Sequence, residues 1–144
     1  MWMPDVNVLI YAHRRDDPDH AFYRDWLQGV VNRGETVAIS PLVASGFVRV
    51  VTNPRIFSVP DPLGPALAML DDLASRRNVV LVHTGPRHLA LFGTLCRATG
   101  ARAKLVADAQ LAAVAMEAGA TLVTRDHDFS AFEPHGLRCL HLAP

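Results

Sequence analysis

The chain has 144 residues, half of them hydrophobic, so it is long enough to bury one core, and we expect a single domain over residues 1–144. Its formal net charge is zero, which excludes the strongly basic class of nucleic-acid-binding proteins and means that any such site must be local. Cys96 and Cys139 form no C-x-x-C pair, and no histidine lies at zinc-ligand spacing, so the sequence favours neither a disulfide framework nor a structural zinc site.

The N-terminus does not have the order of a secretory signal, because Asp5 lies inside the first apolar stretch and Arg14 and Arg15 follow it. No apolar run approaches the roughly 20 residues that are needed to cross a bilayer. We therefore expect a soluble, cytoplasmic protein that makes no use of a membrane.

The first apolar segment, residues 6–11, has two interpretations. Its β-branched residues indicate a buried strand, but a short strand that ends at Asp5, followed by a helix capped by Asn7, also fits. The sequence leaves both open.

The rest of the chain alternates helix signals with short β-rich runs. Asp19 is a candidate N-cap, and Ser40 and Asp61 are each followed by a proline suited to the first turn of a helix. Gly100 marks a helix end. The predicted helices are His20–Asn32, Pro41–Val51, 63–73, 86–99 and 106–118, and the predicted strands are Val37–Ile39, 79–82, Thr121–Thr124 and, at an edge, 137–140.

This alternation predicts an α/β fold with three layers, in which helices flank both faces of a mainly parallel central sheet. In such sheets, ligand sites collect beyond the carboxyl ends of the strands. Aspartates occur at three such positions.

Asp5 is the first of these acids. Beside an apolar segment, an ionised carboxylate loses hydration at a cost of several kcal/mol unless something neutralises it, and a metal ion would do so. The alternative, which the residues alone leave equally open, is that Asp5 only caps a helix.

The other acids also have simpler interpretations. Asp108 is the only charge in an apolar run, but an acid in the first turn of a helix also complements the helix dipole, typically by ~0.3–1 kcal/mol. Asp126 and Asp128 follow a predicted strand, where aspartates often form turns, and His127 between them is expected to be a solvated loop residue.

Together the acids indicate a metal. Carboxylates gathered in one pocket force at least one of them to protonate unless a divalent cation holds them, and oxygen ligands favour Mg²⁺, with Mn²⁺ as a possible substitute. Such an ion lowers the pKa of a bound water and neutralises charge on a phosphoryl oxygen, which is the chemistry of phosphodiester hydrolysis.

Four segments carry a family resemblance. The segments DVNVLIYAH (5–13), FVRVVTNPR (47–55), VADAQLAA (106–113) and LVTRDHDF (122–129) resemble, in order, the PIN-domain toxins of the VapC type, and the likeness covers nearly the whole chain. It implies a PIN-like fold and a Mg²⁺-dependent endoribonuclease that cuts a structured RNA, such as tRNA or ribosomal RNA. It also implies a homodimer and a cognate VapB-like antitoxin that silences it.

The resemblance further implies that Asp5, Asp108 and Asp126 bind the metal, with Asp128 as an auxiliary catalytic acid. Asn7 and Thr124 would be neighbours of the site, together with Arg49 and Gly46. Members of the family commonly place a glutamate at the position of Gly46, so this acidic set is incomplete.

Two rival hypotheses remain. One is a PIN-fold module that binds antitoxin or RNA but cuts weakly or not at all. The other, a phosphoacceptor receiver domain, is disfavoured because Lys104 precedes a helix instead of ending a strand. The RNA is not identified, because arginines can contact phosphates without carrying base information. The candidates are Arg14, Arg15, Arg49, Arg55 and Arg125.

Overall fold

The computed structural model describes residues 1–144 and contains a five-stranded sheet whose neighbouring strands are all parallel, in the order β3-β2-β1-β4-β5. The strands are β1 (Trp2–Pro4), β2 (Val37–Ile39), β3 (Val79–Leu81), β4 (Thr121–Thr124) and β5 (Cys139–His141). The expected parallel α/β sheet is therefore confirmed.

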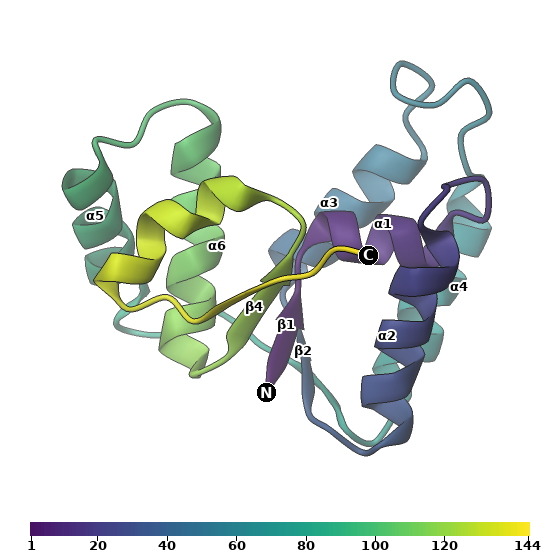
Figure 1. Ribbon diagram of the computed structural model, residues 1–144, viewed down its shortest axis with the longest axis horizontal. Coiled ribbons are helices and arrows are strands. Elements are labelled where there is room, and N and C mark those ends of the chain that lie inside the picture. Colours follow the sequence, from purple (N-terminus) through teal and green to yellow (C-terminus); the bar gives the residue numbers. More distant parts are fainter.

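Helices cover both faces of this sheet and make the three predicted layers (Figure 1). One layer holds α5, α6 and the 3-10 helix η1, and the other holds α1 to α4. The helices are α1 (Val6–His13), α2 (His20–Asn32), α3 (Pro41–Val51), α4 (Leu63–Ala74), α5 (His88–Thr99), α6 (Lys104–Ala118) and η1 (His127–His135). None of them is both long and apolar enough to traverse a bilayer.

The first apolar segment is a helix, so its interpretation as a strand is wrong. The strand ends at Pro4 and α1 begins at Val6. The cap is Asp5, whose carboxylate accepts a hydrogen bond from the Val6 N–H, and not Asn7 as the helical alternative supposed. Val8 and Leu9 are fully buried, and their burial outweighs the modest helix penalty of β-branched residues.

Two aspartates that were expected to cap helices form ion pairs instead. Asp19 precedes α2 but makes no capping bond, because its carboxylate pairs with Arg125 at 2.8 Å. Asp61 pairs with Arg14 at 3.2 Å, and α4 begins after Pro62 without a side-chain cap. Ser40 does cap α3, since its hydroxyl accepts from the Leu42 N–H.

Several element boundaries also differ. β3 ends at Leu81 instead of residue 82, and it is an edge strand in which Val80 and Leu81 are exposed. α5 begins at His88 instead of residue 86, and β5 lies at Cys139–His141 instead of 137–140.

The start of α6 matters for the site. The helix begins at Lys104, two residues earlier than expected, so Asp108 lies in its second turn and not in its first. The dipole explanation for Asp108 is correspondingly weak, because that effect fades beyond the first turn.

Candidate metal-binding active site

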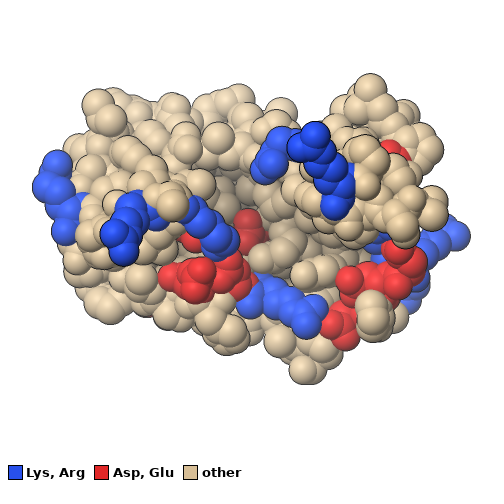
Figure 2. Space-filling view, turned by 90° about the horizontal axis from the view of Figure 1, so that it is seen from above, with Lys and Arg blue, Asp and Glu red and all other residues tan.

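The candidate site lies where the order of the strands reverses. β2 and β3 continue the sheet on one side of β1, whereas β4 and β5 extend it on the other, so a crevice opens beyond the ends of β1 and β4. Asp5 directly follows β1, and Asp126 lies two residues after β4. Figure 2, which views the protein from above Figure 1, shows acidic side chains gathered at a hollow with basic side chains on either side.

A pocket of about 400 Å³ at this crevice collects most of the predicted residues. Its lining includes Asp5, Asn7, Gly46, Arg49, Lys104, Asp108 and Asp126. Thr124 lies just beneath it and is fully buried, and Asp128 lies at the rim with 65% of its side chain exposed.

Asp5 is held rigidly by three donors. Its Oδ1 accepts from the Val6 N–H at 2.7 Å, and its Oδ2 accepts from the Thr124 hydroxyl at 2.7 Å and the Asn7 amide at 3.0 Å. Burial raises the pKa of this carboxyl above its ordinary 3.8, although the hydrogen bonds from Thr124 and Val6 oppose the shift, and Asp108 and Asp126 raise it further. Asp5 is thus both a helix cap and a buried acid in the pocket, so the two interpretations do not exclude each other.

Thr124 and Asn7 join the two strand ends. The Thr124 hydroxyl oxygen, besides donating to Asp5, accepts from the Asp126 N–H at 3.0 Å. Asn7 donates to that same oxygen at 3.2 Å, and its own carbonyl accepts from the Arg125 N–H at 3.2 Å. The acid that follows β1 and the acid that follows β4 are therefore fixed relative to each other by a hydrogen-bond network whose Thr124–Asp5 bond is buried.

The remaining acids form a tight cluster. One carboxylate oxygen from each of Asp108, Asp126 and Asp128 lies within 4.8 Å of the other two. Burial raises the pKa of Asp108, helped by Asp126 and Asp128 and opposed by Lys104. The pKa of Asp126 is lowered, because hydrogen bonds from Lys104 and from the Asp128 N–H outweigh its burial. The cluster thus has the mutual repulsion that a cation relieves.

Lys104 is a site residue that the sequence analysis missed. Its Nζ lies 2.8 Å from Asp108, 2.6 Å from Asp126 and 3.4 Å from Asp128. Lys104 lies four residues before Asp108 and faces that acid only because α6 begins at Lys104, which the apolar pattern did not predict. The Lys104 ammonium partly neutralises these three carboxylates. Carboxylate oxygens at this position also suit a hard cation such as Mg²⁺.

Gly46 in α3 faces the same pocket, but the space above it is filled. A Cβ at position 46 would lie 2.8 Å from a methyl carbon of Val6, the residue after Asp5. Close packing therefore explains this glycine, because α3 approaches the start of α1 too closely for a larger residue.

Two of the arginines that were candidates for phosphate contacts differ in exposure and in partners. Arg49 is exposed and lines the pocket. Arg14 is buried, pairs with Asp16 and Asp61, and lies over the Phe57 ring at 3.7 Å. Arg14 is therefore a structural residue and not a phosphate contact.

His127 is exposed, as expected, and its ring stacks on that of His141 with centroids 4.9 Å apart. It begins η1, so it is not in an irregular loop.

Comparisons with known proteins find matches over most of the chain. A family model described as PIN domain matches residues 3–133. Ribonuclease VapC25 of Mycobacterium tuberculosis is 36% identical over 132 residues, which cover 92% of this chain and 93% of that protein. Ribonuclease VapC43 of the same species is 39% identical over 128 residues, or 89% and 87% of the two chains.

Solved structures show the same fold at low sequence identity. VapBC2 from Rickettsia felis, bound to a promoter DNA fragment, has a TM-score of 0.68 at 20% identity and covers 99% of this chain and 98% of that one. Mycobacterium tuberculosis VapC20, described as a sarcin–ricin loop cleaving toxin, has a TM-score of 0.66 at 20% identity with full coverage of both chains.

Proposed function

This chain belongs to the VapC ribonuclease family of PIN-domain proteins, and from that membership we propose that it cuts a structured RNA with Mg²⁺ held by Asp5, Asp108 and Asp126. Mn²⁺ is the expected substitute, since both ions take carboxylate and water oxygens. Asp128 is an auxiliary acid in this proposal.

The observation that carries the proposal is the meeting of Asp5, Asp108 and Asp126 in one pocket, where the Lys104 ammonium pairs with Asp108 and Asp126. A bound Mg²⁺ supplies a water of lowered pKa and neutralises charge on a phosphoryl oxygen. Carboxylates from the ends of two strands and one helix would bind that ion from one side of the pocket, leaving the open side to the substrate.

The other residues of the site orient these acids. Thr124 and Asn7 hold the Asp5 carboxylate in one position, so that little rearrangement is needed when a cation binds. Arg49, exposed at the pocket wall, is suited to bind an RNA phosphate next to the one that is cut. Basic side chains on both sides of the hollow would hold a backbone across it (Figure 2).

The substrate and partner classes come from the relatives. VapC20 is named for cleaving the sarcin–ricin loop, which is structured RNA, and several solved neighbours are VapBC or FitAB assemblies. We therefore propose a structured RNA substrate and a VapB-like antitoxin partner for this chain. That the RNA is a tRNA or a ribosomal RNA and that the chain forms a homodimer are proposals from the family resemblance.

The deciding experiment is cleavage mapping on total RNA, with Mg²⁺ and with excess chelator. The proposal expects discrete cuts in one structured RNA that vanish in chelator and return with Mg²⁺ or Mn²⁺. Cuts that persist in chelator would contradict it.

A second candidate follows from Gly46, where Val6 fills the space that a carboxylate side chain would need. With fewer protein ligands, the chain would be a PIN-fold module that binds antitoxin or RNA but cuts weakly. RNA binding or antitoxin binding without any cleavage at high Mg²⁺ would favour this alternative.

A further inference from the structure

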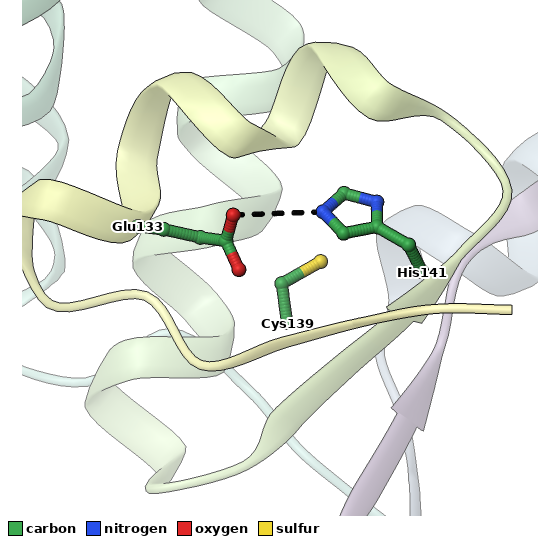
Figure 3. A group of neighbouring side chains, drawn as sticks. All are labelled: Glu133, Cys139 and His141. Carbon is green, nitrogen blue, oxygen red and sulfur yellow. Dashed lines mark ion pairs between the residues drawn. The ribbon is translucent and has the colours of Figure 1, made fainter.

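A second group of metal-ligand side chains lies between η1 and β5 (Figure 3). It shares no residue with the aspartate pocket. It consists of Glu133, Cys139 and His141, and one donor atom from each lies within 4.8 Å of the other two. Cys139 and His141 have C-x-H spacing, which matches neither a C-x-x-C pair nor the usual spacing of zinc-binding histidines.

The fold explains why these three meet. Residues two apart on a strand point to the same face, so β5 presents the Cys139 thiol and the His141 imidazole side by side. η1 passes over that face and brings Glu133 to them, as Figure 3 shows. The ring of His127, at the start of η1, stacks on His141 and helps to fix its plane.

The spacing of the donors suits a metal better than a hydrogen bond. The His141 Nε2 and Glu133 Oε2 atoms are 3.6 Å apart, which is beyond the usual range of N–H···O bonds. Two ligands that each lie about 2.0–2.1 Å from a tetrahedral zinc ion are roughly 3.3–3.4 Å from each other. A small closing movement would therefore place both atoms on one ion.

The side chains also have few partners to give up. His141 Nδ1 is buried without a hydrogen-bond partner, and its Nε2 has only the Ser130 hydroxyl at 3.2 Å besides Glu133. Cys139 is a free thiol. Burial, with the charges of Glu133 and Asp5, raises the pKa of that thiol to about 11, so a metal must displace its proton.

We propose that Glu133, Cys139 and His141 bind a zinc-class divalent cation, with water in the fourth position. The set of thiolate, imidazole and one carboxylate selects zinc or a similar soft ion, whereas the aspartate pocket selects Mg²⁺. The bound ion fastens η1 to β5. Since Asp126 and Asp128 lie at the start of η1, occupancy also holds the acidic half of the pocket in place.

The alternative is an ordinary ion pair between Glu133 and a protonated His141, with Cys139 as a bystander. Both charged side chains are partly exposed, so such a pair contributes little to stability. The ion-pair explanation gives Cys139 no role, so an experiment that detects a metal bound to the Cys139 sulfur distinguishes the two explanations.

The test is a Co²⁺ titration of the full, metal-free chain in saturating Mg²⁺, which occupies the aspartate pocket. Binding through Cys139 gives the near-ultraviolet sulfur-to-cobalt charge-transfer band at one equivalent, and added Zn²⁺ abolishes the band. Cys139→Ser should remove it, and His141→Ala and Glu133→Gln should each weaken binding at least about tenfold.

Two controls locate the site. Cys96→Ser removes the other thiol and should leave the band unchanged. Asp126→Asn should still show the band, because Asp126 is not one of the three proposed ligands. Circular dichroism checks that each variant is folded. The proposal is overturned if the wild-type chain gives no band at millimolar Co²⁺, or if the band survives Cys139→Ser or is lost in Cys96→Ser.

Discussion

The Nζ atom of Lys104 lies 2.6 Å from Oδ2 of Asp126, so the acidic pocket contains a positively charged side chain of the protein itself. The pKa of Lys104 is held well above its ordinary 10.5 because Asp108 and Asp126 outweigh its partial burial, so the ammonium is charged at neutral pH. A bound Mg²⁺ and this ammonium repel each other, which makes Lys104 a competitor of the metal.

The first prediction is that Lys104→Met tightens Mg²⁺ binding by about tenfold, which corresponds to ~1.4 kcal/mol. The same variant should be slightly less stable without metal, by less than about 1 kcal/mol, because Lys104 is largely exposed. Isothermal titration calorimetry gives the affinity. Arg102→Met, which removes a neighbouring exposed charge that makes no ion pair, is the matched control, and equal effects in both variants would contradict the prediction.

The second prediction concerns the acids. Asp5→Asn and Asp126→Asn should each reduce Mg²⁺-dependent cleavage by about a hundredfold or more, the scale of losing a group that stabilises transition-state charge. Melting temperatures should show that both variants fold. Asp128→Asn is the graded control, because its side chain lies at the rim and a smaller loss is expected. Full cleavage by Asp126→Asn would exclude this acid as a ligand.

The third prediction is a pH effect on stability. Asp5 and Asp108 have raised pKa values, so above pH 3.8 the unfolded chain ionises them first and the folded chain binds more protons. The free energy of unfolding in chelator should therefore fall as pH rises from 3.8 through the raised pKa values. Asp126 has a lowered pKa, and its contribution to stability is instead lost below pH 3.8.

Mg²⁺ reverses this trend because it binds the ionised carboxylates. The stabilisation by saturating Mg²⁺ should be larger at about pH 7 than at about pH 5, as denaturant titrations with and without chelator would measure. Asp108→Asn should reduce the pH dependence. An equal gain from Mg²⁺ at both pH values would count against a metal on these groups.

The fourth prediction is self-association through α5. Two leucines of this helix differ in burial: Leu95 is buried, whereas 77% of Leu89 is exposed, which leaves an apolar side chain on the surface. Light scattering at tens of micromolar should give the mass of a dimer, and Leu89→Asp should shift it toward the monomer. A wild-type monomer under these conditions would contradict the prediction.

Much of the fold followed from local signals. Ser40 with Pro41 gave the start of α3, and Gly100 and Gly119, both with positive φ, end α5 and α6. The same signals failed where tertiary contacts redirected them. Asp19 and Asp61 resemble caps, but each is paired with an arginine that is distant in sequence. Asp19 pairs with Arg125, and Asp61 pairs with Arg14.

The candidate site was predictable only in part. Aspartates after strands and at a helix start are visible in the sequence, and parallel topology brings them together. The place of Lys104 was not, because it depends on α6 beginning two residues earlier than the apolar pattern suggests. Ala103, at φ 53, makes this early start through a backbone conformation that non-glycine residues rarely adopt.

The last prediction concerns Gly46 and Val6. Alanine at position 46 gains ~1 kcal/mol in helix propensity, but its Cβ would lie 2.8 Å from a Val6 methyl group, and overpacking costs about 1–3 kcal/mol. Gly46→Ala should therefore destabilise the chain by up to about 2 kcal/mol. The double variant Val6→Ala/Gly46→Ala should be more stable than the two single effects add up to, which a double-mutant cycle measures.

A second set of variants, with glutamate at position 46, tests whether the pocket can take a further carboxylate. Gly46→Glu alone should fold poorly and gain little metal affinity, because Val6 blocks the side chain. In the Val6→Ala background, Gly46→Glu should tighten Mg²⁺ binding and lower the metal concentration needed for cleavage, because an ionised ligand is added at the pocket wall. Val6→Ala alone is the control, since it opens the space without adding charge. If the double variant folds yet needs as much Mg²⁺ as Val6→Ala, a carboxylate at position 46 does not reach the metal, and the incomplete acidic set has no bearing on affinity.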